Sequence, residues 1–371
     1  MSNNTQPEIR FPGFTEDWEQ RKAKELFIPK AEKNQPELPV LSVTQDHGVV
    51  YREQVGIDIK YDKATLKNYK VIHQGDFVIS LRSFQGGFEL SDKLGITSPA
   101  YTIFVPKNMD SQDNLFWKTK FKTFTFIESL KTVTFGIRDG KSISFSEFGD
   151  LKLFFPKNIE EQQKIGAFFK QLDDTIALHQ RKLDLLKETK KGFLQKMFPK
   201  NGAKVPEIRF PGFTEDWEER KLGDITKIST GKLDANAMVE NGKYDFYTSG
   251  IKKYRIDVAA FEGPSITIAG NGATVGYMHL ADNKFNAYQR TYVLQEFLVD
   301  RSFIFSEIGN KLPKKIKQEA RTGNIPYIVM DMLTELKLSI PQNNSEQQKI
   351  GNFFKQLDDT ITLHQRKLDL L

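Results

Sequence analysis

Apolar residues recur at alternating steps of four and three along residues 161–197 of the chain. This 3.5-residue period is typical of the contact face of a coiled coil, and so long an apolar stripe must be covered by a partner. The pattern predicts one helix from about residue 160 to residue 198. Its stripe consists of Ile165, Phe169, Leu172, Ile176, His179, Leu183, Leu186, Lys190, Phe193 and Met197.

A second copy of the helix lies at residues 346–371. It repeats residues 161–186 with only two differences, Asn352 in place of Ala167 and Thr362 in place of Ala177. We expect the two helices to pair within the chain, and pairing between chains is the alternative. The matching stripe consists of Ile350, Phe354, Leu357, Ile361, His364, Leu368 and Leu371.

The length of the connection predicts the direction of the pairing. A helix over residues 160–198 is about 58 Å long at 1.5 Å per residue, whereas a domain of the roughly 145 residues that follow is about 40 Å across. Parallel helices would stretch that domain along the rod, so we expect an antiparallel pair in a pseudo-two-fold arrangement. His179, His364 and Lys190 interrupt the stripe, and we interpret them as polar layers that set the register rather than as ligands.

Another repeat marks the start of two globular domains. Residues 7–22, PEIRFPGFTEDWEQRK, recur at residues 206–221 with Glu219 in place of Gln20. The predicted organisation is a first domain at residues 1–158, a first helix at 159–199, a second domain at 200–344 and a second helix at 345–371.

The interiors of the two domains differ in sequence but share a layout. Predicted strands at residues 75–80 and 263–268 each precede a glycine-containing loop, and further strands follow at 100–105 and 290–294. Helices are expected at about 111–131 and 297–310, before closing strands that end in Pro156 and Pro341. The predicted fold class is therefore α/β, with two globular mixed α/β domains separated by an antiparallel two-helix coiled coil.

Identity between the two helix copies extends beyond the apolar stripe. Packing alone does not require these polar residues to match. Genetic homogenisation of the repeats would explain the match, but we favour outer faces that meet the same partner twice. The residues concerned are Gln162, Gln163, Lys164, Lys170, Gln171, Asp173, Asp174, Gln180, Arg181, Lys182 and Asp184.

Composition narrows the class of protein. The 371 residues suffice for two or three domains, and 39% hydrophobic residues exclude global disorder. The lack of cysteine removes disulfides and thiolate chemistry and fits a reducing compartment. No run of 18 apolar residues and no apolar leader is present, so we expect a soluble, cytoplasmic protein with no membrane partner. The net charge of +6 allows nucleic acid as a partner without requiring it.

The sequence carries no recognisable catalytic motif. GNGATVG at 270–276 lacks the spacing of a dinucleotide fingerprint or a P-loop, and the five histidines lack metal-ligand spacing. The elements Asn-Pro-Pro-aromatic and Pro-Asp…Glu-x-Lys, used by adenine methyltransferases and nucleases, are not found. The pairs Asp173-Asp174 and Asp358-Asp359 have lysines one helical turn away, which indicates solvated ion pairs. We predict no catalytic residue and no metal site.

Basic residues concentrate in both domains between the predicted helix and the closing strand. Residues 118–141 and residues 311–321 each carry an excess of four positive charges. Equivalent placement favours a shared surface for a polyanion, because phosphate contacts give affinity regardless of sequence. An ordinary solvated surface remains the alternative for either cluster alone. The candidate phosphate contacts are Arg138, Lys141, Lys314, Lys315, Lys317 and Arg321.

Base edges are read by polar side chains on loops that enter a DNA groove. The glycine-containing loops and the turns beside them offer such side chains in both domains. The candidates are Arg82, Ser83 and Gln85 in the first domain, and Asn271, Gln289 and Arg290 in the second.

Taken together, these motifs resemble the specificity (S) subunit of a type I restriction-modification enzyme. The similarity rests on Pro156 followed by Glu161-Gln-Gln-Lys-Ile165 and then Leu172-Asp-Asp-Thr-Ile176, all repeated in the second copy, and on the RFPGF…W openings. It implies that each variable domain is a target recognition domain that reads half of a bipartite DNA site in the major groove, with the coiled coil spacing the two.

The resemblance also implies partners. The repeated regions would hold two methyltransferase (M) subunits that use S-adenosylmethionine, and motor-nuclease (R) subunits that use ATP and magnesium would join the full complex on double-stranded DNA. This chain would then be non-catalytic and hold no cofactor. Two different domains on one frame should read an asymmetric site with half-site centres about one turn, ~10 bp, apart. The expected coiled-coil and partner residues are Ile165, Phe169, Leu172, Ile176, Leu183, Leu186, Ile350, Phe354, Leu357, Ile361 and Leu368.

Two other functions stay open from the sequence. A self-contained nuclease or methyltransferase with an unrecognised site would turn over DNA unaided when given S-adenosylmethionine, ATP and magnesium. A tandem adaptor that holds two copies of a protein partner would lack affinity for duplex DNA at low salt.

Overall fold

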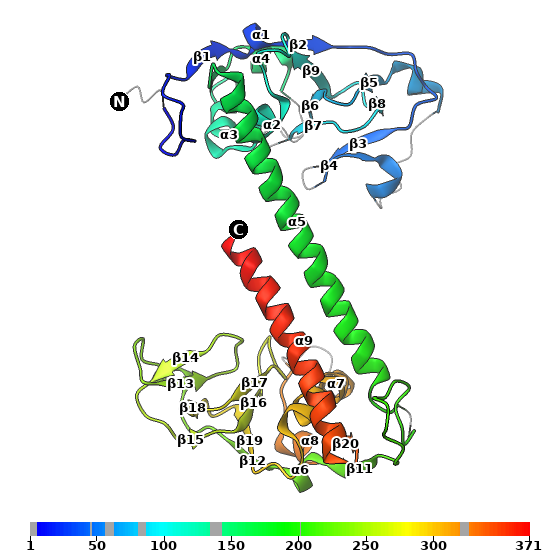
Figure 1. The fold of residues 1–371 in the computed structure, drawn as a ribbon, viewed down its shortest axis with the longest axis vertical. Helices are drawn as coiled ribbons and strands as arrows, with labels where there is room; N and C mark the ends of the chain where they lie inside the picture. The colour runs from blue at the N-terminus through cyan, green and yellow to red at the C-terminus, as the bar shows by residue number, and fades with distance from the viewer. Residues whose placement is uncertain are drawn as a thin grey trace. The chain divides into compact units, whose positions relative to one another are not determined.

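The computed structural model describes residues 6–44, 47–55, 63–80, 87–133, 143–200, 202–319 and 326–371. The chain divides into two compact units, Met1–Thr175 and Ile176–Leu371 (Figure 1). The long helix α5, Ile159–Lys196, confirms the helix predicted from the apolar stripe. Its residues up to Thr175 belong to the first unit and those from Ile176 to the second.

The first unit is built around a four-stranded antiparallel sheet in the order β2-β9-β6-β7. Two smaller pairs, β3 with β4 and β5 with β8, extend from it. The bounds are β2 Phe27–Lys30, β9 Thr102–Pro106, β6 Phe77–Ile79, β7 Phe88–Leu90, β3 Leu41–Thr44, β4 Gly48–Tyr51, β5 Lys70–Ile72 and β8 Gly95–Thr97, with 3₁₀ turns η1 Arg52–Val55 and η2 Lys63–Asn68.

Short helices enclose an aromatic core in the first unit. The ring of Phe77 stacks on Phe104 from the sheet at 5.3 Å, and Trp117 stacks on Phe121 from α2 at 5.7 Å. Asp113 begins α2 by accepting a hydrogen bond from the Phe116 N–H. The remaining elements are β1 Glu19–Lys22, which pairs with β10 Lys152–Phe155, and the helices α1 Ala23–Leu26, α2 Asn114–Lys122, α3 Phe124–Leu130 and α4 Phe145–Gly149.

The second unit repeats this framework with its own sheet order β12-β19-β16-β17. A second sheet, β14-β13-β18-β15, contains one parallel pair, β13 with β18. The strands are β11 Glu218–Lys221, β12 Lys227–Thr230, β13 Tyr244–Tyr247, β14 Tyr254–Ile256, β15 Phe261–Glu262, β16 Ser265–Ala269, β17 Met278–Ala281, β18 Lys284–Ala287, β19 Thr291–Gln295 and β20 Lys337–Ile340. The helices are α6 Leu222–Ile225, the 3₁₀ turn η4 Ala235–Ala237, α7 Arg301–Glu319, α8 Met330–Thr334 and α9 Asn344–Leu370.

The strands predicted in both domains are confirmed, but the helices differ in extent from the expectation. The stretch at 111–131 forms two helices, because Thr123 ends α2 and caps α3. The stretch expected at 297–310 continues to Glu319 through Pro313. It continues because Ile308 and Leu312 stay on the buried face, while Pro313 lies on the exposed side.

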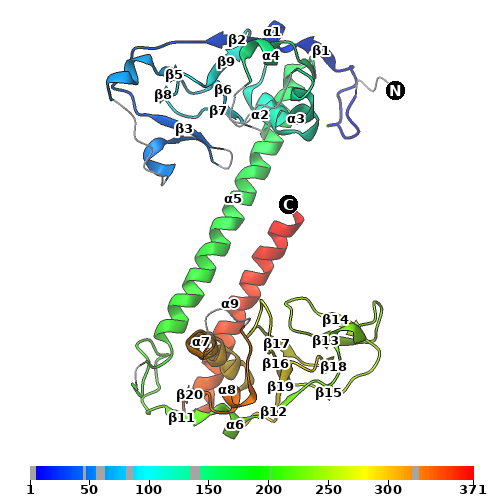
Figure 2. The same cartoon turned by 180° about the vertical axis from the view of Figure 1, so that it is seen from behind.

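Within the second unit, α9 packs antiparallel to the C-terminal half of α5 (Figures 1 and 2). His179 lies beside His364, with 3.0 Å between the two Nδ1 atoms. Farther along α5, Lys190 Nζ lies 2.5 Å from Asp358 Oδ1, and the ring of Phe193 contacts Phe353 at 5.1 Å. Numbers rise on one helix as they fall on the other, which confirms the antiparallel pairing over this part.

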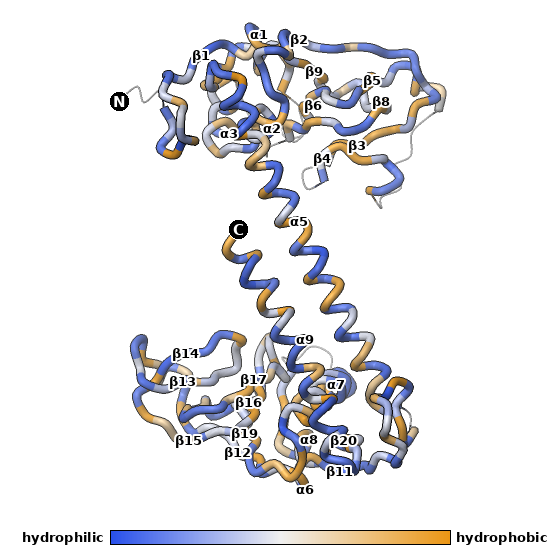
Figure 3. Tube along the Cα trace, in the orientation of Figure 1, coloured by the Kyte–Doolittle hydropathy of each residue, from blue (hydrophilic) through white to orange (hydrophobic). Residues whose placement is uncertain are grey.

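The apolar stripe does not face one neighbour throughout. Ile350 and Phe354 lie in the core of the second domain, and Ile165 packs against the core of the first. Leu183 is buried in the second unit, whereas Phe169 is 41% exposed. Figure 3 shows the alternation of apolar and polar residues along both helices. Leu172, Ile176, Leu186, Leu357, Ile361 and Leu368 are half-buried.

Candidate nucleic-acid interface

Each domain is fixed to the start of a repeated helix by a buried ion pair. Arg10 donates to Glu161 from Nε at 2.7 Å and from Nη2 at 2.8 Å. Arg209 makes the same two-pronged contact with Glu346 at 2.6 and 2.7 Å. Both carboxylates are buried, so each pair needs its full geometry to offset desolvation.

A glutamine completes this connection in each domain. The Oε1 atom of Gln162 accepts from the backbone N–H of Asp113 at 2.9 Å, and its Nε2 donates to the Pro156 carbonyl at 2.8 Å. Gln347 bonds Asp300 and the Pro341 carbonyl in the same way. We call the arginine, glutamate and glutamine together the latch. Gln162 is one of the polar residues that match between the two helix copies. The sequence analysis placed it on an outer face, but its side chain forms hydrogen bonds inside the first domain.

Three loops of the second domain meet at one end of the β12-β19-β16-β17 sheet. The Gly270 N–H donates to the Arg290 carbonyl at 2.9 Å, which joins the loop after β16 to the turn before β19. The Ser249 hydroxyl donates to Asn271 Oδ1 at 2.5 Å, which joins the loop after β13. The structure thus brings together Asn271, Gln289 and Arg290, three of the predicted base-reading residues.

The three residues are not equally free to read a base. Asn271 uses its amide oxygen on Ser249 and its backbone in a bridge with Tyr327, so two-pronged recognition of adenine would first have to break a hydrogen bond. Gln289 and Arg290 are exposed on the turn between β18 and β19. Arginine on such a turn can donate twice to guanine, which makes Arg290 the stronger candidate.

The predicted lysines at the end of α7 lie beside the same loops. A Cβ on Gly276 would lie 2.7 Å from Ile316, so the loop after β16 packs closely on the end of α7. Lys314 and Lys317 are exposed there. Lys315 is paired with Glu319 and is less available to a phosphate.

Neighbouring residues that sequence reasoning missed extend this surface. Lys252 and Lys253 are exposed on the loop that Ser249 joins to Asn271. Tyr327 is 58% exposed, and Tyr277 is also exposed next to the loop after β16. No local motif marks these residues, because the sheet topology alone brings their loops together. We call Lys252, Arg290, Lys314, Lys317 and Tyr327 the basic edge.

In the first domain, several predicted residues lie outside the described part of the chain. These are Arg82, Ser83, Gln85, Arg138 and Lys141. Arg321 of the second domain also lies outside the described residues. The loop that carries the first three follows β6, in the position that the loop with Asn271 has after β16. The Ser80 N–H donates to the Gly87 carbonyl at 2.8 Å and closes the base of that loop.

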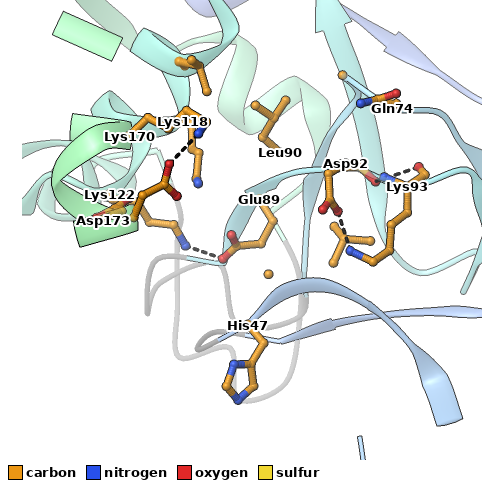
Figure 4. A pocket seen from close by; sticks show the side chains of 16 residues that line it. His47, Gln74, Glu89, Leu90, Asp92, Lys93, Lys118, Lys122, Lys170 and Asp173 are labelled. Atoms are coloured by element: carbon orange, nitrogen blue, oxygen red, sulfur yellow. Dashed lines mark hydrogen bonds and ion pairs between the residues drawn. The ribbon is translucent and has the colours of Figure 1, made fainter. Parts of the chain in front are cut away.

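The first domain has a cavity of about 710 Å³ that is lined by residues of β7, α2 and α5, among others (Figure 4). Four lysines line it, but so do four carboxylates, so it has no net positive charge. Lys122 is paired with Glu89, and Lys170 with Asp174 at 2.6 Å. Burial raises the pKa of Glu89, although the ammonium of Lys122 opposes that shift.

Pairing also weakens the basic cluster expected at residues 118–141. Besides Lys122, Lys131 pairs with Glu128 at 2.6 Å. Burial lowers the pKa of Lys120, whose ammonium lies 5.7 Å from the centre of the Trp18 ring. Counting charges along the sequence overlooked these internal partners, so the described lysines offer less to a polyanion than their number suggested.

Within the residues that the structure describes, no group of three or more histidine or acidic side chains is placed to hold a metal ion. Nor does any helix among them combine the length and apolar character needed to cross a membrane.

Comparison with known families assigns the chain to a class. Residues 15–188 and 214–371 match the family model described as "Type I restriction modification DNA specificity domain". These segments cover most of the chain, and the chain therefore belongs to this family. It is the family of the specificity subunits of type I restriction-modification systems, which are non-catalytic.

Individual relatives agree with this assignment. The type I restriction enzyme MjaVIII specificity subunit of Methanocaldococcus jannaschii is 24% identical over 352 residues, covering 84% of this chain and 79% of the relative. The EcoDI specificity subunit of Escherichia coli is 34% identical over 148 residues. That match covers 39% of this chain and only 33% of the relative, so the chain spans about a third of the EcoDI subunit's length there.

A solved structure shares the fold. The crystal structure of a type I restriction-modification S subunit from M. genitalium superposes with a TM-score of 0.68 at 17% identity, covering 95% of this chain and 92% of that one. At this identity the likeness shows the fold alone. Specificity subunits of type I systems bind DNA and assemble with the other subunits of the complex.

Proposed function

We propose that this chain reads the DNA target of a type I restriction-modification complex. Each domain reads one half of an asymmetric site in duplex DNA, interrupted by bases that neither domain reads. One observation carries the proposal: both domains have the equivalent sheet order and the same latch, but the segments that follow β6 and β16 differ in sequence. A shared framework with different loops suits two unrelated half-sites.

In this proposal the parts of the chain have separate tasks. Residues 1–158 and 200–344 are the target recognition domains, and the helices at 159–199 and 345–371 space them and dock partners. In the second domain, Arg290 and Gln289 read bases, and Lys314 and Lys317 contact phosphates. In the first domain, the loop with Arg82, Ser83 and Gln85 has the equivalent place, and Arg138 and Lys141 contact phosphates.

The repeated outer faces are proposed to hold two methyltransferase subunits. Gln163, Lys164 and Lys170 are exposed, and so are the matching residues of the second copy. The pair of Lys170 with Asp174 at 2.6 Å recurs as Lys355 with Asp359 at 3.1 Å. Two identical exposed faces support the binding of the same partner twice. Catalysis, with S-adenosylmethionine, ATP and magnesium, then belongs to the methyltransferase and motor-nuclease subunits.

The test is to co-express the chain with its candidate methyltransferase and to sequence the methylated DNA. We expect one asymmetric, interrupted motif. A contiguous or palindromic motif would contradict the proposal, as would modification without any motif.

Variants of the basic edge sharpen this test. Arg290→Ala should relax the motif at one base pair of one half-site, at a cost of about 1–3 kcal/mol, and leave the other half-site unchanged. Lys314→Ala and Lys317→Ala should instead weaken binding to all sequences and lower the slope of log K against log salt by about one each. Lys227→Ala is the matched control, because Lys227 is exposed at the opposite end of β12 and pairs with Glu296 at 2.7 Å.

A further inference from the structure

Two apolar side chains are exposed on the segment that leads into α8. In this segment Ile328 is buried in the core of the second domain, whereas Tyr327 is 58% exposed and Val329 is 46% exposed. The backbone of Val329 is extended. Because side chains alternate between the two faces of an extended chain, Tyr327 and Val329 point to the same outer side. We call these two residues the apolar pair.

The backbone that carries the apolar pair is anchored at three points. The Ile328 N–H donates to the Gly270 carbonyl at 2.8 Å, and the Ile328 carbonyl accepts from the Tyr292 hydroxyl at 2.8 Å. Tyr327 itself forms a backbone bridge with Asn271. The apolar pair therefore has a fixed place beside the loop after β16.

Local stability does not account for a valine at position 329. Val329 is the N-cap residue of α8, and its side chain has no atom that could accept a hydrogen bond from the helix. At the equivalent position of the first domain, before α4, Ser144 accepts from the Glu147 N–H and completes a capping box. The fold is thus compatible with a capping residue here, and the valine forgoes that stabilisation. Residues that break a local rule in this way are expected at functional sites.

The surroundings of the apolar pair are positively charged. Gly270, which bonds Ile328, also donates from its N–H to the Arg290 carbonyl at 2.9 Å. Lys314 and Lys317 are exposed at the end of α7, which packs on the same loop. Such a surface suits the phosphates of DNA. Apolar side chains within it have a match on the base edges of the major groove, where thymine presents its 5-methyl group.

We propose that the apolar pair contacts the 5-methyl group of a thymine in the half-site that the second domain reads. The ring of Tyr327 and the methyl groups of Val329 supply the apolar contact, and the anchored backbone sets its place relative to Arg290. The half-site therefore contains an A·T base pair near the pair that Arg290 reads. This inference rests on the proposed reading of DNA and adds one base pair to its target.

The test uses the chain co-expressed with its methyltransferase and duplexes that carry the methylation motif. The half-site of the second domain is the one that Arg290→Ala relaxes. Replacing each of its thymines in turn by deoxyuridine removes only the 5-methyl group. We expect one position at which binding, followed by fluorescence anisotropy, weakens about fourfold, as the loss of one buried methyl group implies. In the double variant Tyr327→Ser with Val329→Ser, thymine and deoxyuridine at that position should bind equally.

Two single variants separate base reading from folding. Val329→Ser should raise the midpoint of thermal unfolding by about 2–4 °C, because serine caps α8, and at the same time reduce the preference for thymine. A purely structural role for Val329 would not combine a gain of stability with a loss of that preference. Leu298→Ser is the matched control and should leave the preference unchanged, because Leu298 is 70% exposed and follows the end of β19 that lies away from Arg290.

Three results would overturn the inference: a half-site of G·C pairs alone, no position at which the deoxyuridine effect depends on the apolar pair, or a double variant that loses methyltransferase binding but keeps its preference for thymine. The last result would assign the apolar pair to a protein contact. Failure of the proposed function would look different, because duplex DNA would then be bound without preference for any motif or not at all. That result would overturn both proposals.

Discussion

Glu307 on α7 is fully buried in the second domain, and its ionisation should control the stability of that domain. Its carboxylate accepts from the Ser339 N–H at 3.2 Å and from Asn310 Nδ2 at 3.3 Å, and Lys311 Nζ lies 3.8 Å away. Burial raises the pKa of Glu307 to about 7, and Lys311 offsets only part of that effect. The folded domain therefore holds the proton over a pH range in which the unfolded chain has released it.

The sign and size of the effect follow from this difference in pKa. Below pH 4.5 both states bind the proton, so the stabilisation from the neutral form is complete. Stability then falls as the pH rises toward about 7, because only the unfolded state has ionised. The gap between 4.5 and about 7, at about 1.36 kcal/mol per pH unit, corresponds to about 3 kcal/mol.

Urea unfolding between pH 4.5 and pH 8, compared with Glu307→Gln, measures this loss. The chain has three tryptophans, and Trp217 reports on the second domain when its resonance is followed in fluorotryptophan-labelled protein. The variant should gain about 3 kcal/mol over the wild type at the alkaline end and match it at the acid end. Glu319→Gln, an exposed change on the same helix, is the control and should show neither effect. A constant difference between wild type and Glu307→Gln at every pH would refute the reasoning.

Two further predictions concern the repeated helices. Gly351→Ala should destabilise the second domain by about 1–3 kcal/mol in thermal unfolding, because the added Cβ would lie 2.7 Å from the Phe303 backbone nitrogen. Gly192→Ala on α5 is the control: its added Cβ would meet nothing within 4 Å, so the change should be neutral or stabilising. Equal losses of stability in Gly351→Ala and Gly192→Ala would contradict the close packing of Gly351 against Phe303. The pKa of His364 is lowered by burial and by His179, so the helix pair should lose stability as the pH falls below about 6.5. NMR titration should show the His364 pKa rising in His179→Asn, and an unchanged value would exclude the contact.

Much of the fold follows from patterns that act over short distances. The 3.5-residue stripe marked both long helices, and alternation ending in proline marked the closing strands β10 and β20. The length of the connection was enough to predict the antiparallel pairing now seen from His179 to Phe193 in the second unit. These features depend on chain geometry and periodicity, which the sequence displays directly.

Other features depend on which neighbour a side chain meets. The stripe marked Ile350 and Phe354 as apolar, but it could not show that the core of the domain covers them rather than the other helix alone. Gln162 looked like a surface residue, because the repeat does not show that the backbone N–H of Asp113 donates a hydrogen bond to its side chain. Lys122 added a positive charge to the cluster counted along the sequence, but in the fold it pairs with Glu89. The basic edge likewise depends on a sheet order that no local pattern reveals.

The latch has a consequence for how such proteins change their targets over generations. Both domains are joined to their helices by the same arginine, glutamate and glutamine, which lie within nearly identical stretches of sequence. Recombination between the repeated stretches would move an entire reading module without altering the joint that carries it. New specificities would thus arise by exchange of intact parts, and the helix faces that we propose to bind the enzymatic subunits would be inherited unchanged.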